Sequence, residues 1–259
     1  MRRLRDPRDG CAWDRQQSFS SIAPSTLEEA YEVVDAIERD DLSELKSELG
    51  DLLFQVVFHA QIASEQEAFD FNDVAAAIAE KLLRRHPHLF AAADKPTLEQ
   101  QSAQWENIKA QERQAAGNGD RSHLAGVPRA LPALARAAKL SKRAARVGFD
   151  WDQPEQTAEK VAEELEEVLQ ALRAGGGGPK PSANLFEEIG DLLFAVANLA
   201  RKVNVDAESA LRAANSKFER RFRHMERSVL ASGDIFERLP LDALEKLWVA
   251  AKRAELNGG

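Results

Sequence analysis

The sequence predicts an all-α protein built from two tandem helical-bundle domains. Apolar residues recur at helical spacing, for example at Leu192, Val196 and Leu199, and no alternating strand pattern is found. An acidic pattern also occurs twice, each time with similar residues before and after it. Because internal repetition is typical of tandem domains, we expect each copy to form one helical unit.

Composition limits the classes of protein to consider. The 259 residues suffice for two domains, with 44% hydrophobic and 30% charged residues, as in an ordinary globular chain. A net charge of −8 disfavours direct binding to nucleic acid or to an anionic membrane surface. No apolar run approaches the ~20 residues of a membrane span. A single cysteine excludes an intramolecular disulfide, so we expect a cytoplasmic protein.

The expected domains are residues 1–117 and 129–259, joined by a polar linker over 118–128. Ser25 and Thr26 precede acidic residues, so we expect the first acidic helix to begin there. Gly175 to Gly178, with Pro179 and Pro181, indicate a loop inside the second domain.

The repeat extends beyond the acids. Both halves show the same order: a Trp-Asp pair, two acidic helices, a basic helix and a tryptophan helix, in which Trp13, Lys81 and Trp105 correspond to Trp151, Lys217 and Trp248. Glu164 lies 135 residues after Glu29, and Asp191 lies 140 residues after Asp51. The difference falls in the glycine-rich loop, where an insertion costs little. Trp13 and Trp151 are interpreted as packing anchors.

The second copy carries two pairs of acids at helical spacing. Glu164 and Glu167 are three residues apart, as are Glu188 and Asp191, so each pair lies on one helix face. One such pair is usually a solvated surface feature. Asp191, however, stands where an apolar helix begins, and buried carboxylates must be paired, protonated or bound to metal. Since we expect no lysine or arginine to neutralise the acidic helices, we predict a metal site.

The first copy repeats this acidic set. Its members are Glu29, Glu32, Glu48 and Asp51, for which we predict a second metal site. Carboxylate oxygens suit hard cations, so the predicted ion is Mg²⁺, with Mn²⁺ as a substitute. A di-iron bundle would need a Glu-x-x-His pair, and neither acidic helix has one.

Phosphate is the expected ligand of such a metal. The basic helix of the second copy places Lys217, Arg220 and Arg221 within about one turn, where they suit phosphate oxygens or, equally well, salt bridges. Trp248 could stack on a base, although a tryptophan at helical spacing is more often part of a core. The sequence has neither a Walker-type nor a Rossmann glycine motif, so side chains and metal would hold the phosphates.

These motifs together resemble a known family. Glu-Glu-x-x-Glu followed by Glu-x-x-Asp is typical of the all-α nucleoside triphosphate pyrophosphohydrolases, and the resemblance to their two-domain MazG-like members covers nearly the whole chain. It includes Gly50-Asp51-Leu52-Leu53-Phe54-Gln55, Arg85-His86-Pro87-His88 and Lys217-Phe218-Glu219-Arg220-Arg221. The resemblance implies Mg²⁺-dependent hydrolysis of triphosphates such as ATP to monophosphate and pyrophosphate, in a homodimer. It further implies metal binding by Glu164, Glu167, Glu188 and Asp191, and nucleotide binding by Lys160, Asn184, Glu187, Asp191, Lys217, Arg220, Arg221 and Trp248.

The two copies differ around their acids. Lys160 lies one turn before Glu164, whereas Ser25 occupies the equivalent place in the first copy. Asn184 precedes Glu188, whereas Glu44, an acid that would repel a triphosphate, precedes Glu48. Pro87 should also end the first basic helix early. We therefore expect nucleotide hydrolysis in the C-terminal half.

Two readings of the function follow from the sequence. The first is an enzyme in which metal-activated water attacks the α-phosphorus, and either Glu163 or Glu167 accepts the proton. The alternative is a non-catalytic nucleotide-sensing or partner-binding helical module, whose acids only organise the bundle. Short bundles with acids on an inner seam leave apolar stripes uncovered, so we also predict a homodimer.

Overall fold

The computed structural model describes residues 1–90, 96–115, 122–176 and 182–257. These residues form two compact units, Met1–Gln114 and Ala115–Gly259. Throughout the described ranges the regular structure is helical, which confirms the predicted all-α class. Residues 118–121 of the predicted linker and Gly177, Gly178, Pro179 and Pro181 of the predicted loop lie outside the described residues.

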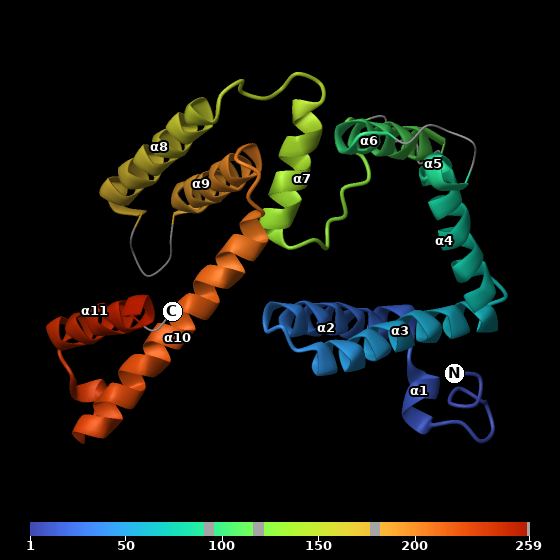
Figure 1. Ribbon diagram of the computed structural model, residues 1–259, viewed down its shortest axis with the longest axis horizontal. Helices are drawn as coiled ribbons and strands as arrows, with labels where there is room; N and C mark the ends of the chain where they lie inside the picture. The colour runs from blue at the N-terminus through green and yellow to red at the C-terminus, as the bar shows by residue number, and fades with distance from the viewer. Residues whose placement is uncertain (91–95, 116–121, 177–181, 258–259) are drawn as a thin grey trace. The chain divides into compact units, whose positions relative to one another are not determined.

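The first unit is organised around the antiparallel pair α2 (Phe19–Glu38) and α3 (Leu42–Glu65). Figure 1 shows α4 (Phe71–Arg85) continuing from the end of α3, and the short α1 (Ala12–Gln16) next to the start of α2. α5 (Pro87–Phe90) and α6 (Leu98–Ala115) follow α4. Ile22, Phe58 and Ile62 are buried together between α2 and α3 and form the core of the pair.

The start of α2 differs from the prediction. The helix begins at Phe19 rather than near Ser25, because Ser18 and Ser21 form a reciprocal capping box. Pro24 lies inside the helix. A proline near a helix start removes one hydrogen bond but already has a helical φ, so it does not end the helix here. Asp41 caps α3 by accepting from the backbone of Ser43 and Glu44.

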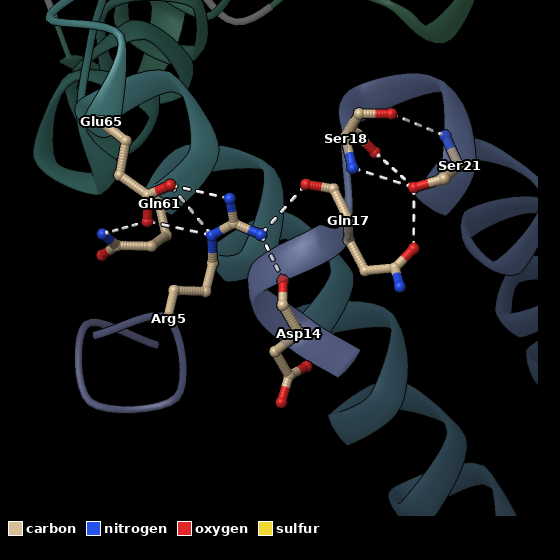
Figure 2. Close-up of polar contacts among 7 residues, drawn as sticks. All are labelled: Arg5, Asp14, Gln17, Ser18, Ser21, Gln61 and Glu65. Carbon is tan, nitrogen blue, oxygen red and sulfur yellow. Dashed lines mark hydrogen bonds and ion pairs between the residues drawn. The ribbon is translucent and has the colours of Figure 1, made fainter. Parts of the chain in front are cut away.

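Arg5 fixes the N-terminal segment to this core (Figure 2). Its guanidinium donates to both carboxylate oxygens of Glu65 on α3, at 2.9 and 2.7 Å, and to the backbone oxygens of Asp14 and Gln17. It also lies over the ring of Phe58, 5.4 Å from the centroid. Trp13, predicted to be a packing anchor, is instead 59% exposed in the unit.

The second unit contains the equivalent pair, α8 (Pro154–Ala171) and α9 (Ala183–Lys202), preceded by α7 (Ala133–Ala145). α7 packs against α9, with Ala137, Ala197 and the first residue of α10, Ala207, buried at their junction. A π turn, Leu172–Gly176, ends α8. Before α8, Asp150 forms ion pairs with Arg201 and Lys202 at 2.7 and 3.1 Å, which holds the incoming chain against the end of α9.

α10 (Ala207–Ser232) is the longest helix of the second unit, and α11 (Leu241–Asn257) packs along its second half (Figure 1). A 3₁₀ turn, Phe236–Arg238, joins the two helices. The corresponding helix of the first unit, α4, ends at Arg85 just before Pro87, whereas α10 runs eleven residues beyond Arg221, as the proline predicted. Within the described ranges, none of the helices combines the length and apolarity that a bilayer crossing requires.

Candidate functional site

The pairing of α8 with α9 brings three predicted ligands together. Glu164 on α8 and Glu188 and Asp191 on α9 each offer a carboxylate oxygen, and these oxygens all lie within 4.8 Å of one another. Glu164 is only 7% exposed, whereas Asp191 reaches the surface. Three carboxylates at this distance repel one another strongly unless cations neutralise them. The arrangement has the donor chemistry of a site for a hard divalent cation.

The fourth predicted ligand, Glu167, lies beside this group rather than within it. Its position on α8 is half-buried. Burial, followed by the charges of Glu164 and Glu188, raises the pKa of the Glu167 carboxyl above its ordinary value. Glu167 is therefore close enough to interact electrostatically with both Glu164 and Glu188, and it holds a proton more readily than an exposed glutamate does.

Lys160 corrects the expectation that the acidic helices carry no neutralising cation. Its Nζ donates to Glu163 at 2.8 Å and lies 2.7 Å from Glu164 Oε1. Hydrogen bonding to Glu163, and then to Glu164, raises the pKa of Lys160, which stays protonated at neutral pH. One ammonium group thus offsets part of the charge of two acids, while Glu188 and Asp191 form no ion pair with it in the structure.

A cavity of about 420 Å³ opens beside these acids. Glu164, Asp191 and Lys160 form one side of it. Its remaining lining is mostly apolar, with three polar side chains, and consists of Leu124, Leu140, Ser141, Ala144, Phe149, Trp151, Thr157, Phe194, Ala195 and Asn198. Trp151, predicted to be a packing anchor, is 38% exposed and lines this cavity. The volume lies within the range of about 300–1,000 Å³ that is typical of small-molecule sites.

The first unit retains three of its four acids as a cluster. Oxygens of Glu29, Glu48 and Asp51 lie within 4.8 Å of one another, while Glu32 is exposed on α2. Burial, followed by Asp51 and Glu32, raises the pKa of Glu29; burial, followed by Glu32, raises that of Glu48. Gln55 donates an amide hydrogen to Glu29 at 3.4 Å. No metal-ligating geometry beyond these carboxylates is seen in the described part of this unit.

Glu44, which the sequence suggested would repel a triphosphate, forms an ion pair. Arg39 Nη2 lies 2.9 Å from Glu44 Oε1, and Arg39 also bonds to Asp35. The pair is solvent-exposed, so the attraction is modest. Even so, Arg39 offsets the charge of Glu44, and repulsion by Glu44 is a weaker reason to exclude a triphosphate than expected.

The basic helix and Trp248 form a separate group on α10 and α11. Arg221 lies over the Trp248 ring, 5.7 Å from its centroid, and Phe218 contacts the same ring at 5.2 Å. Glu255 pairs with Arg221 at 2.7 Å and with Arg220 at 3.5 Å. None of these residues, nor the exposed Lys217, lines the cavity beside Glu164, and Figure 1 shows α11 away from the α8–α9 pair. Asn184 and Glu187 are exposed near the start of α9.

Comparison with known proteins identifies the domain that both acidic clusters occupy. The MazG nucleotide pyrophosphohydrolase domain matches the chain twice, over residues 17–90 and 152–226. The chain belongs to the MazG nucleotide pyrophosphohydrolase family. Each match spans one set of acids, so the MazG domain occurs once in each of the two copies predicted from the sequence.

Two relatives are similar to this chain over nearly their whole length. A nucleoside triphosphate pyrophosphohydrolase of Escherichia coli (strain K12) is 51% identical over 257 residues, covering 99% of this chain and 96% of the relative. A protein of Thermotoga maritima named nucleoside triphosphate pyrophosphohydrolase/pyrophosphatase MazG is 45% identical over 252 residues, covering 97% of this chain and 92% of the relative.

Sequence reasoning did not single out several residues that line the cavity. Thr157, Ser141 and Asn198 line the cavity and are each less than 9% exposed. They carry no charge and match no motif, so nothing in the second copy alone distinguishes them. Alignment of the two halves offers a signal, since Ile22 and Phe58 stand where Thr157 and Asn198 stand in the second copy.

Proposed function

We propose that this nucleoside triphosphate pyrophosphohydrolase cleaves its substrate at the acids of the second unit, between the α- and β-phosphates. The observation that carries this proposal is the convergence of Glu164, Glu188 and Asp191 beside a cavity of nucleotide-binding size. We further propose that these acids, with Glu167, bind Mg²⁺, for which Mn²⁺ can substitute. An all-carboxylate donor set fits either ion, and does not resemble the histidine- and cysteine-containing sites of softer metals.

The bound metal would supply a nucleophile, by lowering the pKa of water, and charge neutralisation on the phosphates. Glu167 is the proposed general base. Burial, and then the charges of Glu164 and Glu188, raise the pKa of its carboxyl above the ordinary value, which favours proton acceptance. Glu163, the other carboxylate considered, is exposed and accepts a hydrogen bond from Lys160 at 2.8 Å. The proton therefore passes to a Glu167 oxygen as water attacks, and pyrophosphate leaves.

Lys160 can bind either the glutamates of its own helix or the phosphates of the substrate. It holds Glu163 and Glu164 while no substrate is bound, and it lines the cavity. A triphosphate at the acids would offer phosphate oxygens to the same ammonium group, and a charge-assisted bond to phosphate is strong. We propose that Lys160 transfers from the glutamates to the substrate, which ties its position to nucleotide binding.

Residues of α10 and α11 would complete the site from a second copy of the chain. Lys217, Arg220, Arg221 and Trp248 lie apart from the cavity of their own unit. On α8 and α9, Phe186, Leu193 and Leu165 are 75%, 52% and 47% exposed. Several large apolar side chains exposed on one helix pair indicate a contact surface, whereas a single exposed one would not. We propose a two-fold homodimer that covers these faces and brings the basic helix of one copy to the acids of the other.

Product analysis tests the proposed reaction. Purified protein with Mg²⁺ should convert a triphosphate to equimolar monophosphate and pyrophosphate, separated by ion chromatography. Chelation of the metal should stop the reaction, and Mg²⁺ or Mn²⁺ should restore it. Release of orthophosphate and diphosphate would contradict attack at the α-phosphorus. Nucleotide binding without any turnover would support the alternative of a non-catalytic sensing module.

A further inference from the structure

A threonine that lines the cavity beside Glu164 carries a hydroxyl group without a hydrogen-bond partner among the described residues. Thr157 is 1% exposed, and its Oγ1 has no hydrogen-bond partner among the described residues. Buried polar groups are normally hydrogen-bonded, and an exception calls for a specific reason. Thr157 lines the cavity. A ligand group inside the cavity would provide the missing partner, and since a hydroxyl can donate or accept, it would suit either kind.

Asn198 lines the same cavity, and the orientation of its side-chain amide is defined by a hydrogen bond. Its Oδ1 accepts a hydrogen bond from Arg201 Nε at 2.8 Å. An arginine nitrogen can only donate, so this contact fixes which end of the amide is the oxygen. Arg201 is itself held by Asp150 at 2.7 Å, and Asn198 is 7% exposed. The amide Nδ2 is therefore the group of Asn198 that remains to donate to a ligand.

The first unit shows what happens when the same two positions become apolar. Ile22 is the counterpart of Thr157, and Phe58 is the counterpart of Asn198, by the offsets of the two acidic clusters. Ile22 and Phe58 are 2% and 0% exposed and pack together in the core of α2 and α3. Gln55 in addition extends toward Glu29, where Ala195 is a small lining residue in the second unit. In the first unit, protein side chains occupy the space next to the acids.

We propose that the cavity of the second unit receives the base of the nucleoside triphosphate, that Thr157 holds it, and that Asn198 selects bases with a keto edge. A donor from Asn198 Nδ2 pairs with a keto oxygen, as in guanine, uracil or hypoxanthine, and meets the amino group of adenine or cytosine unfavourably. The apolar lining accommodates the ring faces. This inference rests on the proposed function, because it assigns the substrate's base to a place beside the proposed site of cleavage.

Two matched pairs of substrates isolate the keto group. UTP and CTP differ in the base edge that carries the keto or amino group, and so do ITP and ATP. We expect the wild-type protein to give a higher kcat/KM for pyrophosphate release with the keto member of each pair. The substitution Asn198→Asp replaces the donor by an acceptor, and should shift both ratios toward the amino member by about tenfold, the effect of one hydrogen bond.

Thr157→Val tests independently whether the Thr157 hydroxyl binds the base. Valine has the shape of threonine without the hydroxyl, so KM for both members of a pair should rise by about tenfold, with kcat and the ratio unchanged. Because the buried hydroxyl has no protein partner, the urea midpoint of this variant should equal or exceed that of the wild type. Ser228→Ala is the control. Its hydroxyl donates to the backbone of His224 on α10, outside the cavity, and its loss should change neither KM nor the ratios.

The possible outcomes separate the inference from the proposed function. No pyrophosphate release from any triphosphate by the wild-type protein would overturn the proposed function. Release without a keto preference, an Asn198→Asp ratio equal to that of the wild type, or an unchanged KM in Thr157→Val would each overturn the inference alone. If Asn198→Asp fails to fold, the wild-type ratios and the Thr157→Val measurements still decide it.

Discussion

At the scale of single residues, the two acidic clusters look alike and their neighbours differ. Both bring three carboxylates within 4.8 Å. In the described parts of the chain, Glu164 has the ammonium group of Lys160 beside it, whereas Glu29 has the amide of Gln55. The ammonium group can leave Glu164 and bind a phosphate oxygen instead. A neutral amide carries no charge that would attract a triphosphate. Equal metal-binding capacity therefore need not give equal catalysis.

The first prediction compares these two glutamates directly. Glu164→Ala should abolish most pyrophosphate release, because the cluster beside the cavity loses a ligand, while Glu29→Ala should leave most of it. Initial rates over a panel of triphosphates provide the measurement, and far-ultraviolet circular dichroism checks that both variants remain helical. Comparable losses from the two substitutions would show that the first unit is also a site of hydrolysis.

The Glu112 carboxyl provides a prediction of pH dependence. Hydrogen bonds from Arg85, and then Arg84, lower the pKa of Glu112 from 4.5 to about 2. A lowered folded-state pKa contributes stability that is fully present above the unfolded value, and is lost as the pH falls from about 4.5 toward 2. The protection of α6 amides from hydrogen exchange, relative to the intrinsic rate at each pH, should therefore fall over that interval in the wild type. In Glu112→Gln this loss of protection should be smaller, since residue 112 no longer titrates.

At the scale of elements, the α8–α9 pair is stabilised by packing and strained by charge. Val168, Ala171 and Leu185 are buried between the two helices, and the three clustered acids lie within about one to two turns of them along each helix. The raised pKa of Glu167 shows that ionisation there opposes folding, so stability from this group is lost as the pH rises through its folded-state pKa. A bound divalent cation would reverse that balance.

Metal titration tests this balance. Mg²⁺ should raise the unfolding temperature of the wild type, since a ligand at 100 times its Kd adds about 2.7 kcal/mol to the free energy of unfolding. Asp191→Asn relieves repulsion, so without metal it should unfold at the same or a higher temperature, yet show a smaller shift with Mg²⁺. Differential scanning calorimetry measures both. Equal Mg²⁺ shifts in the two proteins would argue against a metal site at Asp191.

Much of the element scale was predictable from the sequence, because helices and acidic pairs follow local spacing. The proline at residue 87 correctly predicted the end of α4 at Arg85. The start of α2 was predicted too late. Its capping box has Ser21 at the position where the usual sequence signature has glutamate or glutamine. The roles of Thr157 and Asn198 were not predictable, since an uncharged polar residue reveals its burial and its missing partner only once helices from distant parts of the sequence are packed together.

At the scale of the whole molecule, uncovered apolar surface is the dominant feature of both units. Leu53 on α3 is 55% exposed, as its counterpart Leu193 on α9 is at 52%. The repeat thus places matching apolar residues on the outside of both helix pairs. Surfaces of this kind are typical of protein–protein contacts.

Assembly is therefore the last prediction. Light scattering at micromolar concentration should give a dimer mass, twice the 28.7 kDa of the chain. Leu193→Glu should shift the mass toward a monomer, because a charge cannot be buried without a partner. Lys46→Glu, at an exposed position of α3, introduces the same side chain with a larger change of charge, and is the control that should remain dimeric. A monomeric wild type would remove the support for residues of a second copy completing the site.

The length of α10 makes the molecule sensitive to helical phase. Its first residue, Ala207, is buried against α7 and α9, while Phe222 and Arg221 further along contact Phe236 and Glu255. One residue inserted between these contact zones would rotate α11 by about 100° relative to α9, because a turn takes about 3.6 residues. Seven inserted residues would restore the direction to within about 20° while lengthening the helix by about 10 Å. Natural variation in this stretch should therefore consist of substitutions, with insertions and deletions confined to the loops.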